Sequence, residues 1–443
     1  MQDFKYFQAL FSNKLSKTNI VILSDLVKCF LCLQFTSGIL TLSRYSNYCE
    51  RTLSRFMNLE IAWLDLNLLV VKFSVGNLLG PFLLCADETV EGKAGKKTHG
   101  ISRFFSSIQQ QPIRSVCLFG FSLVSVKSGI SYPLMLEQVV KTDADIVLIK
   151  AKKDKKQAGK GKAKGRKLGQ KNSIKIENQT ASYRIFKICF LKITTSLLSI
   201  FGNIFKPIVV VDSAYGTQDY MDLVCNKGLK MISKLRNSTQ LFFLPDRQEK
   251  KRGRPVKYGK NVNLNQLHTS FLVSEKTEKN NIIKVFSFQA LNKSIPKYLL
   301  NIVIIETTNT KINKVGYAIL FSNDLTLTAD QIITYYQLRF QIEFDFRDVK
   351  QYFGIHKMKN YKEKPMMQMF NLAFFSLTVS RVLVEQYRVL YKLPNLSILD
   401  LKNIVRTRWI LNSVLISSQN DPKSINNSIF IEQFMPNDMI NAA

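Results

Sequence analysis

Apolar residues recur at intervals of three and four in the first and last parts of the chain, which is the spacing of an amphipathic helix. Near the start, residues 1–75 are expected to be helical, with the clearest pattern at residues 20–32 and 53–69. Further helices are predicted at residues 182–201, 330–352, 365–391 and 396–418.

Between these helices, short apolar runs indicate buried strands. One run covers residues 81–86 and ends in Asp87-Glu88, and another covers residues 207–211 and ends at Asp212. A helix at residues 217–226 and a strand follow Asp212, a βαβ arrangement typical of an α/β core. The remaining strands are predicted at residues 115–126, 132–140, 229–235, 282–291, 299–307 and 316–322.

These patterns divide the 443 residues into several units. No helix-type period separates the last three strands, so we interpret them as an antiparallel β insertion within an α/β core. The predicted units are residues 1–78, a helical domain; 79–236, the first part of the core; 237–325, the insertion; 326–420, the last part of the core with the C-terminal helices; and 421–443, a tail.

The charge of the chain suggests a partner. There are 63 Lys and Arg residues against 32 Asp and Glu residues, a formal net charge of +31. Such an excess favours a polyanion, because basic side chains displace condensed counterions from phosphates. The alternative is compositional drift, since the chain is rich in Lys, Asn and Ile.

The cysteines and the apolar stretches indicate the cellular compartment in which the protein lies. Seven cysteines, mostly within apolar runs, favour free thiols in a reducing environment, although Cys29 and Cys32 have the spacing of a metal or redox site. The N-terminus lacks the layout of a signal peptide, and polar residues interrupt the long apolar stretches. We therefore expect a cytoplasmic protein without a membrane span.

Two basic segments are candidate DNA contacts. Residues 150–171 hold 11 Lys and Arg residues and one acid in 22 positions, which predicts a loop that either is simply solvated or lies along DNA. Residues 42–45 and 51–56 suit two short helices, the second carrying Arg51 and Arg55 one turn apart. They fit either a helix-turn-helix, which would make residues 1–78 a DNA-binding domain, or a plain helical bundle.

A more specific pattern lies in the helix predicted at residues 330–352. Five polar residues are spaced by 3, 4, 4 and 3 positions, so they project from one face of a single helix: Tyr336, Arg339, Glu343, Arg347 and Lys350. The opposite face is apolar and suits a core. Taken alone, ion pairs between Glu343 and the neighbouring arginines are the ordinary interpretation of such a face.

Two aspartates change that interpretation. Asp87 and Asp212 each end a strand-like run, where a carboxylate lies at the mouth of a sheet. Together with Glu343 they could converge on hard divalent cations, because Mg²⁺ prefers oxygen ligands. Two such ions about 4 Å apart activate a water or hydroxyl and stabilise the leaving oxygen of a phosphodiester. Basic residues around Glu343 would hold the phosphate backbone.

The helical pattern resembles that of a known family. The run Tyr336-x2-Arg339-x3-Glu343-x6-Lys350 matches the Tyr-Arg-Glu-Lys motif of bacterial cut-and-paste insertion-sequence transposases, the insertion-sequence-four family, which carry an Asp-Asp-Glu triad. The resemblance spans roughly residues 20–360.

The two aspartate regions carry the same resemblance. Ala86-Asp87-Glu88-Thr89 is similar to the region of the family's first aspartate, and residues 209–216 are similar to that of the second. The spacing after Asp212 is tighter than in some members, so the role of Tyr215 stays open.

The resemblance implies a ribonuclease-H-like catalytic core with a β-rich insertion between the second aspartate and the glutamate. It implies Asp87, Asp212 and Glu343 as ligands of Mg²⁺ or Mn²⁺, as two ions. The residues that the resemblance implies as contacts of transposon-end DNA are Tyr336, Arg339 and Lys350, and the basic Arg347 on the same helix face is a further candidate DNA contact. The implied reaction is strand cleavage at the terminal inverted repeats of the element and transfer of the freed 3′-hydroxyl end to target DNA, by a homodimer on paired ends at the nucleoid.

Secondary candidates have weaker signals. Strand alternation points Glu88 away from Asp87, so it is predicted to be a neighbour and not a ligand. His99 resembles a family position near the scissile DNA, although a lone His in a basic loop is also ordinary. Arg252-Gly253-Arg254-Pro255 resembles a minor-groove hook, a match of four residues that is common by chance.

Two other functions fit the same residues. A transposase relic without catalysis would act only as a sequence-specific DNA-binding protein, and a host nuclease of the same fold would lack element ends. The complete helical motif and the presence of all three carboxylates favour an active enzyme.

Overall fold

The computed structural model describes residues 9–33, 38–75, 80–147, 180–245, 256–312 and 314–417. Several sequence predictions lie outside this part of the chain. They are the basic loop at residues 150–171, the arginines Arg252 and Arg254, and the tail at residues 421–443.

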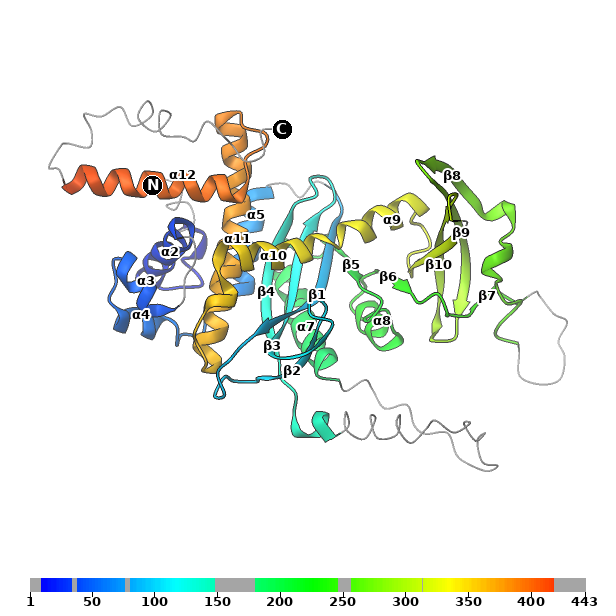
Figure 1. Ribbon diagram of the computed structural model, residues 1–443, viewed down its shortest axis with the longest axis horizontal. Helices are drawn as coiled ribbons and strands as arrows, with labels where there is room; N and C mark the ends of the chain where they lie inside the picture. The colour runs from blue at the N-terminus through cyan, green and yellow to red at the C-terminus, as the bar shows by residue number, and fades with distance from the viewer. Residues whose placement is uncertain are drawn as a thin grey trace.

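Five strands form the centre of the molecule: β1 (Phe82–Gly92), β3 (Gln111–Ser125), β4 (Ser131–Val139), β5 (Ile208–Val211) and β6 (Met231–Leu235). They are hydrogen-bonded in the order β4-β3-β1-β5-β6. β4, β3 and β1 are antiparallel neighbours, whereas β1, β5 and β6 are parallel. Three antiparallel strands continued by parallel ones form a ribonuclease-H-like core (Figure 1), which confirms the predicted α/β fold class. The short strand β2 (Ser102–Ser106) pairs with the start of β3.

Asp87 lies in the middle of β1, so the expectation that it ends a strand is wrong. β1 pairs with β3 over its whole length, from Phe82 to Gly92, whereas its parallel pairing with β5 stops at Ala86. The ladder with β3 keeps β1 extended past the apolar run, because that run marks the buried part of the strand and not its end. Asp212, by contrast, directly follows the last residue of β5, as predicted.

Helices cover the two faces of this sheet. On one face, Phe186 of α7 (Ala181–Phe201) packs edge-on against Phe119 of β3, with ring centroids 5.8 Å apart. On the other face lie α10 (Gln341–Phe353), which contacts β1, β3 and β4, and α11 (Glu363–Tyr391), which packs along β4. Because side chains alternate along β1, Asp87 and Glu88 face opposite layers.

The helix predicted at residues 330–352 is two helices, which corrects the sequence prediction. α9 (Ala329–Leu338) begins with a capping box between Thr328 and Gln331 and ends before Arg339. Around Arg339 and Phe340, backbone N–H groups bond three residues back, as in Arg339 N–H to the Tyr336 carbonyl at 3.2 Å. This tighter turn interrupts the α-helical hydrogen bonding, so the motif residues come from two helices and the turn between them.

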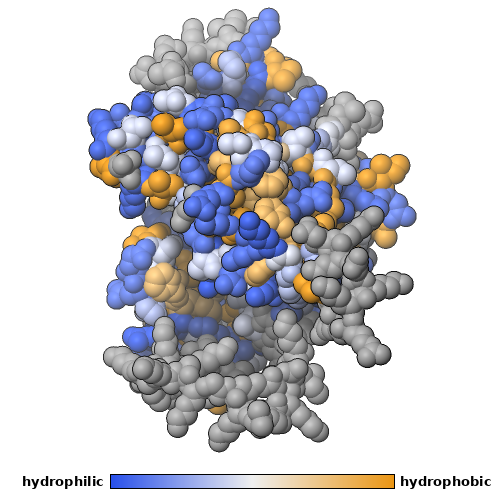
Figure 2. Space-filling view, turned by 90° about the vertical axis from the view of Figure 1, so that its right-hand side faces the viewer, coloured by the Kyte–Doolittle hydropathy of each residue, from blue (hydrophilic) through white to orange (hydrophobic). Residues whose placement is uncertain are grey.

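The sheet continues from β6 into the insertion. β11 (Lys314–Ser322) pairs with β6, and β10 (Ile295–Asn309), β9 (Asn281–Asn292), β8 (Leu272–Glu278) and β7 (Leu241–Phe242) complete eleven strands among the described residues. The strands β9, β10 and β11 contain the three runs that the sequence predicted. This part forms one end of the molecule (Figure 1), and its surface is mostly hydrophilic with scattered hydrophobic residues (Figure 2). The helix α8 (Gln218–Cys225) connects β5 to β6.

The first helices lie at the other end of the molecule (Figure 1). They are α2 (Lys17–Cys32), α3 (Ile39–Tyr45) and α4 (Glu50–Phe56), and α12 (Ile398–Ser417) packs on α2. The next helix, α5 (Trp63–Val75), packs against β4, α7 and α11. The helical pattern at residues 53–69 is divided between α4, which ends at Phe56 like the short helix predicted at residues 51–56, and α5. Asn58 ends α4, because its backbone N–H bonds to the Arg55 carbonyl and its side chain to the Ser54 carbonyl.

Among the described helices, α11 alone is long and apolar enough to cross a membrane by length and composition. However, 89% of its most apolar window is buried in the molecule, against β4, α5, α10 and α2. The helix is therefore the central helix of this fold's core. All seven cysteines are free, and five of them are buried.

Candidate active site

Three elements bring Asp87, Asp212 and Glu343 together. The register of β1 with β5 pairs Ala86 with Val211, so Asp87 and Asp212 are side by side on neighbouring parallel strands. Glu343 lies in the first turn of α10, which packs on β1 over the face that carries Asp87. The three carboxylates are thus presented by two strands and one helix.

Two side chains of the α9–α10 segment connect these carboxylates. The Arg339 guanidinium donates to Asp87 Oδ2 at 3.1 Å and to Glu343 Oε1 at 3.0 Å. The Tyr336 hydroxyl donates to Asp212 Oδ1 at 3.2 Å. Arg339 is only 5% exposed, so its guanidinium lies inside the site, between two of the carboxylates and away from solvent.

Burial and mutual repulsion make the site electrostatically costly. Burial raises the pKa of Asp87 to about 6, and the charges of Glu343 and Asp212 act in the same direction, against the effect of Arg339. Burial, with the Asp212 charge, raises the pKa of Tyr336 to about 12. Burial alone would lower the pKa of Arg339, but the surrounding negative groups outweigh it and raise that pKa. The Arg339 guanidinium thus offsets only part of the cost of charging Asp87.

The donor set suits a divalent cation, but its present arrangement does not form a closed metal site. Carboxylate oxygens are the ligands that Mg²⁺ and Mn²⁺ take, and an undercompensated buried carboxylate such as Asp87 is one that a cation stabilises. In the part of the chain that the structure describes, no group of three or more His, Cys, Asp or Glu side chains has the geometry to hold a metal ion. Arg339 occupies the space between Asp87 and Glu343 that such an ion would need.

The other two basic motif residues lie further along α10 and make their own ion pairs. Lys350 Nζ is 2.6 Å from Oε1 of Glu91, a side chain of β1 that is only 6% exposed. Arg347 is 60% exposed and pairs with Asp348 at 3.0 Å, not with Glu343. Lys350 therefore lies beside the strand that carries Asp87, and Arg347 faces solvent.

The structure does not bring His99 into contact with Asp87, Asp212 or Glu343. Its ring lies 3.5 Å from Glu363 at the start of α11, and its backbone N–H bonds to the Tyr361 carbonyl at 2.9 Å. Glu88 faces the α7 layer, where it accepts from the Cys117 thiol at 3.5 Å, as strand alternation predicted. Tyr215 is buried in the same layer, against Phe119.

The sequence reasoning missed the residues that seat α10. Gly120 of β3 pairs directly with Asp87, and a Cβ atom at Gly120 would lie 2.6 Å from the Phe346 ring of α10. The missing side chain lets α10 approach the sheet at the level of Asp87. No signal in the sequence points to this contact, because it joins residues that are far apart in the chain.

A buried polar network holds the same helix. Asp345 is completely buried and accepts from the hydroxyls of Ser122 at 2.7 Å and of Ser131, and from Arg381 of α11 at 2.7 Å. Glu91 was also missed, although a signal for it exists. Asp87 and Glu91 are four residues apart in an extended strand, so period-two alternation places them on one face.

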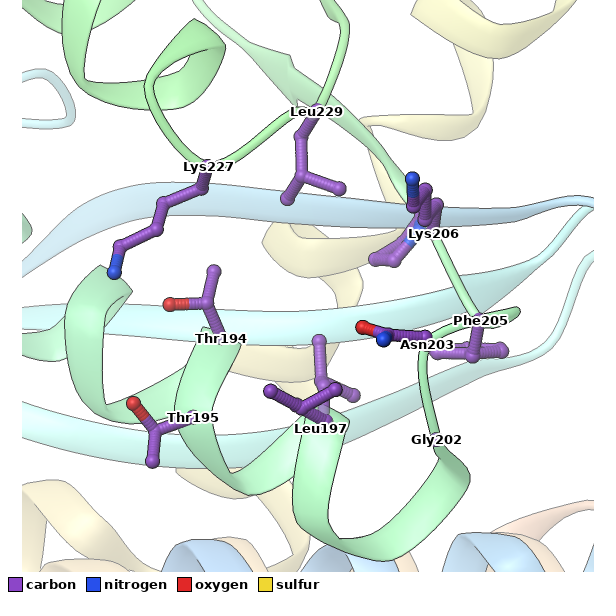
Figure 3. Close-up of a pocket in the computed structure, with 11 residues that line it drawn as sticks. Thr194, Thr195, Leu197, Gly202, Asn203, Phe205, Lys206, Lys227 and Leu229 are labelled. Carbon is purple, nitrogen blue, oxygen red and sulfur yellow. The ribbon is translucent and has the colours of Figure 1, made fainter.

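A cavity of about 160 Å³ lies elsewhere, between α7 and the segments that lead into β5 and β6 (Figure 3). Leu197, Lys206 and Lys227 are among its lining residues. It opens at the amino ends of β5 and β6, whereas Asp212 follows the carboxyl end of β5. This cavity therefore does not belong to the carboxylate site.

Comparison with known families agrees with this geometry. The family model described as DDE superfamily endonuclease matches residues 50–280, a stretch that contains Asp87 and Asp212. Because that match covers more than half of the chain, the protein belongs to the DDE superfamily of endonucleases. A second model, described as Transposase DDE domain, matches residues 191–379, which contain Asp212 and Glu343, and supports a DDE transposase. A search of curated proteins found no match.

Proposed function

We propose that this protein is a cut-and-paste transposase of the insertion-sequence-four family, which cleaves DNA at the ends of its element and transfers those ends to target DNA. The observation that carries the proposal is that three carboxylates, on β1, directly after β5 and on α10, converge at the α9–α10 segment, where the buried Arg339 pairs with Asp87 and Glu343 and the Tyr336 hydroxyl bonds to Asp212. A purely structural ion-pair network would not need two acids to share one cation beside a third acid, because uncompensated charge is destabilising.

Asp87, Asp212 and Glu343 are the proposed ligands of Mg²⁺ or Mn²⁺, held as two ions. Bound there, such ions would activate a water or 3′-hydroxyl and stabilise the leaving oxygen of a phosphodiester. The site can take up this role once Arg339 leaves Asp87 and Glu343. A DNA phosphate offers the guanidinium an alternative bidentate partner.

The proposed DNA-holding residues lie along the same segment. Tyr336 and Arg339 are beside the carboxylates, and Lys350 lies two helical turns beyond Glu343 on α10. Arg347 is exposed and can reach a backbone phosphate, and its present partner Asp348 keeps a second ion pair with Arg381. In this way α9, α10 and the turn between them would place the scissile strand over β1.

Further DNA contacts are proposed outside this segment. Arg51 and Arg55 are exposed on α4, while Leu53 and Phe56 of the same helix are buried, so α4 offers DNA a basic face. His99, Arg252 and Arg254 and the basic residues at 150–171 complete the proposed contacts. A homodimer on paired terminal inverted repeats, acting at the nucleoid, is the assembly that fits this reaction.

A cleavage assay tests the proposal. Purified protein is incubated with Mg²⁺ or Mn²⁺ and with DNA that carries the sequences flanking its coding gene. Strand cleavage is expected for the wild type and should be lost in Asp87→Asn, Asp212→Asn and Glu343→Gln. Glu385→Gln, which neutralises a half-buried carboxylate of α11 that pairs with Arg388, serves as the matched control and should cleave normally.

Cleavage by all three variants at the wild-type rate would refute the assignment of the site. Absence of cleavage by the wild type, with specific binding to the flanking sequences retained, would favour a relic that only binds DNA.

A further inference from the structure

A second basic feature lies beyond the carboxylate site. Two loops, residues 92–98 between β1 and β2 and residues 356–361 after α10, enclose a cleft of about 750 Å³. None of its lining residues is acidic. Its basic lining residues are Lys93, Lys96, Lys97, His356, Lys357 and Lys359.

The cleft has a fixed frame and an exposed charged lining. Lys93 donates to the Met358 carbonyl and lies 5.5 Å from the Phe370 ring, so its ammonium ties one loop to the other. The backbone bond from His99 to Tyr361 is a second tie between the same segments. Lys96, Lys97 and Lys359 are exposed. The frame thus holds several cations near one another, which is unfavourable unless an anion lies between them.

The cleft continues the carboxylate site in one direction. β1 and α10 lie against each other, with Asp87 and Glu343 at one level and the Glu91–Lys350 ion pair at the next. β1 then ends at Gly92, which is itself a lining residue of the cleft. Asp87 and Gly92 are five positions apart along the strand, a distance of roughly 17 Å at the rise of an extended strand. That length corresponds to about five base pairs of duplex.

We propose that this cleft binds the sugar-phosphate backbone of duplex DNA, about five base pairs from the cleaved bond. The proposal rests on the proposed function, because it takes the scissile phosphate to lie at Asp87. Lysines are strongly hydrated point charges without the bidentate geometry of arginine, so they suit phosphates better than base edges. The contact is therefore independent of sequence and serves to position the duplex.

The test compares two triple variants of the full chain. Lys96→Ala/Lys97→Ala/Lys359→Ala removes three exposed lysines of the cleft. Lys206→Ala/Lys227→Ala/Lys230→Ala removes the same charge from exposed lysines at the amino ends of β5 and β6. Binding of a 30-base-pair duplex of arbitrary sequence is measured by fluorescence anisotropy over a range of salt concentrations.

Each phosphate contact that is lost lowers the slope of log affinity against log salt by about 0.9. We expect the cleft variant to lower that slope by about 2 to 3 and to weaken binding at low salt at least about tenfold, beyond any change in the control variant. Equal slopes for the two triple variants would overturn the proposal.

Cleavage of the flanking-sequence DNA separates this proposal from the proposed function. If the wild type cleaves and the two triple variants bind alike, the cleft proposal fails alone. If the wild type does not cleave but the cleft variant loses salt dependence, the cleft is a DNA site and the transposase assignment fails.

Discussion

Arg339 has two incompatible sets of partners in this account. In the structure its guanidinium lies between Asp87 and Glu343 and is almost entirely buried. In the proposed reaction the same carboxylates bind divalent cations and the arginine binds a DNA phosphate. Arg339 therefore competes with metal ions before DNA arrives, and DNA would favour metal binding by removing that competition.

The variant Arg339→Ala is expected to bind Mn²⁺ more tightly than the wild type in the absence of DNA, by at least about tenfold, which corresponds to about 1.4 kcal/mol. The physical reason is that the variant lacks the buried positive charge between the two proposed metal ligands Asp87 and Glu343. Binding is measured from the electron paramagnetic resonance signal of free Mn²⁺. The same variant should cleave DNA more slowly, because its phosphate contact is lost.

Arg347→Ala is the matched control, since Arg347 is exposed and pairs with Asp348. An Mn²⁺ affinity of Arg339→Ala equal to that of the control would show that the guanidinium does not occupy the metal position.

At the scale of elements, the placement of Glu343 depends on how α10 is seated. Gly120 lets the Phe346 ring approach β3, and the buried Asp345 joins α10 to Arg381 of α11. Removing one partner of a buried acid that bonds an arginine and two hydroxyls lowers the stability of the protein by several kcal/mol. Such contacts fix the helix, and they fix Glu343 one turn away from Phe346.

Gly120→Ala is expected to displace α10 and slow DNA cleavage at least about tenfold, with a loss of stability of about 1–3 kcal/mol. The added Cβ would lie 2.6 Å from Phe346 Cε1, so the ring has to move and the helix with it. Cleavage rates and urea denaturation measure the two effects. The double variant Gly120→Ala/Phe346→Leu provides the space and should recover much of the rate. A wild-type rate for Gly120→Ala alone would mean that this contact does not place Glu343.

A buried lysine joins α12 to α2. Lys402 is 5% exposed and donates to the carbonyls of Phe30 and of Leu33 at the end of α2, at 2.8 Å for Leu33. Burial lowers its pKa to about 7, whereas a lysine in an unfolded chain titrates near 10.4. Between these values the unfolded chain binds a proton that the folded protein does not, so this group's contribution to stability rises with pH.

We compare the free energy of unfolding of Lys402→Met with that of the wild type at each pH. The difference, variant minus wild type, is predicted to be more positive at pH 7 than at pH 10 by on the order of 4 kcal/mol. Below pH 7 the wild type carries the full cost of a buried ammonium, and above pH 10 that cost is gone. Urea denaturation at the two pH values measures the difference, and the loss of the carbonyl contacts cancels between them. Lys276→Met, an exposed position on β8, controls for the loss of charge. Parallel pH profiles for wild type and Lys402→Met would contradict the argument.

At the scale of the whole molecule, local sequence patterns predicted most of the helices and strands but not the tertiary contacts between them. The sequence pattern located the five central strands and β9, β10 and β11 of the insertion but missed β2, β7 and β8. The spacing of Tyr336, Arg339 and Glu343 pointed to one site. Asp87 was misplaced within its strand, because the length of β1 is set by its pairing with β3. The position of Arg339 could not be predicted, because it depends on a turn between two helices and on carboxylates from two other elements.

The cleft could not be predicted from the sequence for the same reason. The loops at residues 92–98 and 356–361 are far apart in the chain and meet only because β1 and α10 run together. Charge alone would have marked both as ordinary solvated loops.

The most direct test of the central claim exchanges a proposed metal ligand for one of different softness. In Asp87→Cys, a thiolate replaces the carboxylate, and a thiolate binds Mg²⁺ poorly but accepts softer ions such as Mn²⁺ or Cd²⁺. This variant is expected to fail to cleave DNA in Mg²⁺ and to recover cleavage in Mn²⁺ or Cd²⁺, while Asp87→Ala stays inactive in all three. Cleavage by Asp87→Ala in any of these metals, or wild-type cleavage by Asp87→Cys in Mg²⁺, would contradict a role for Asp87 as a metal ligand.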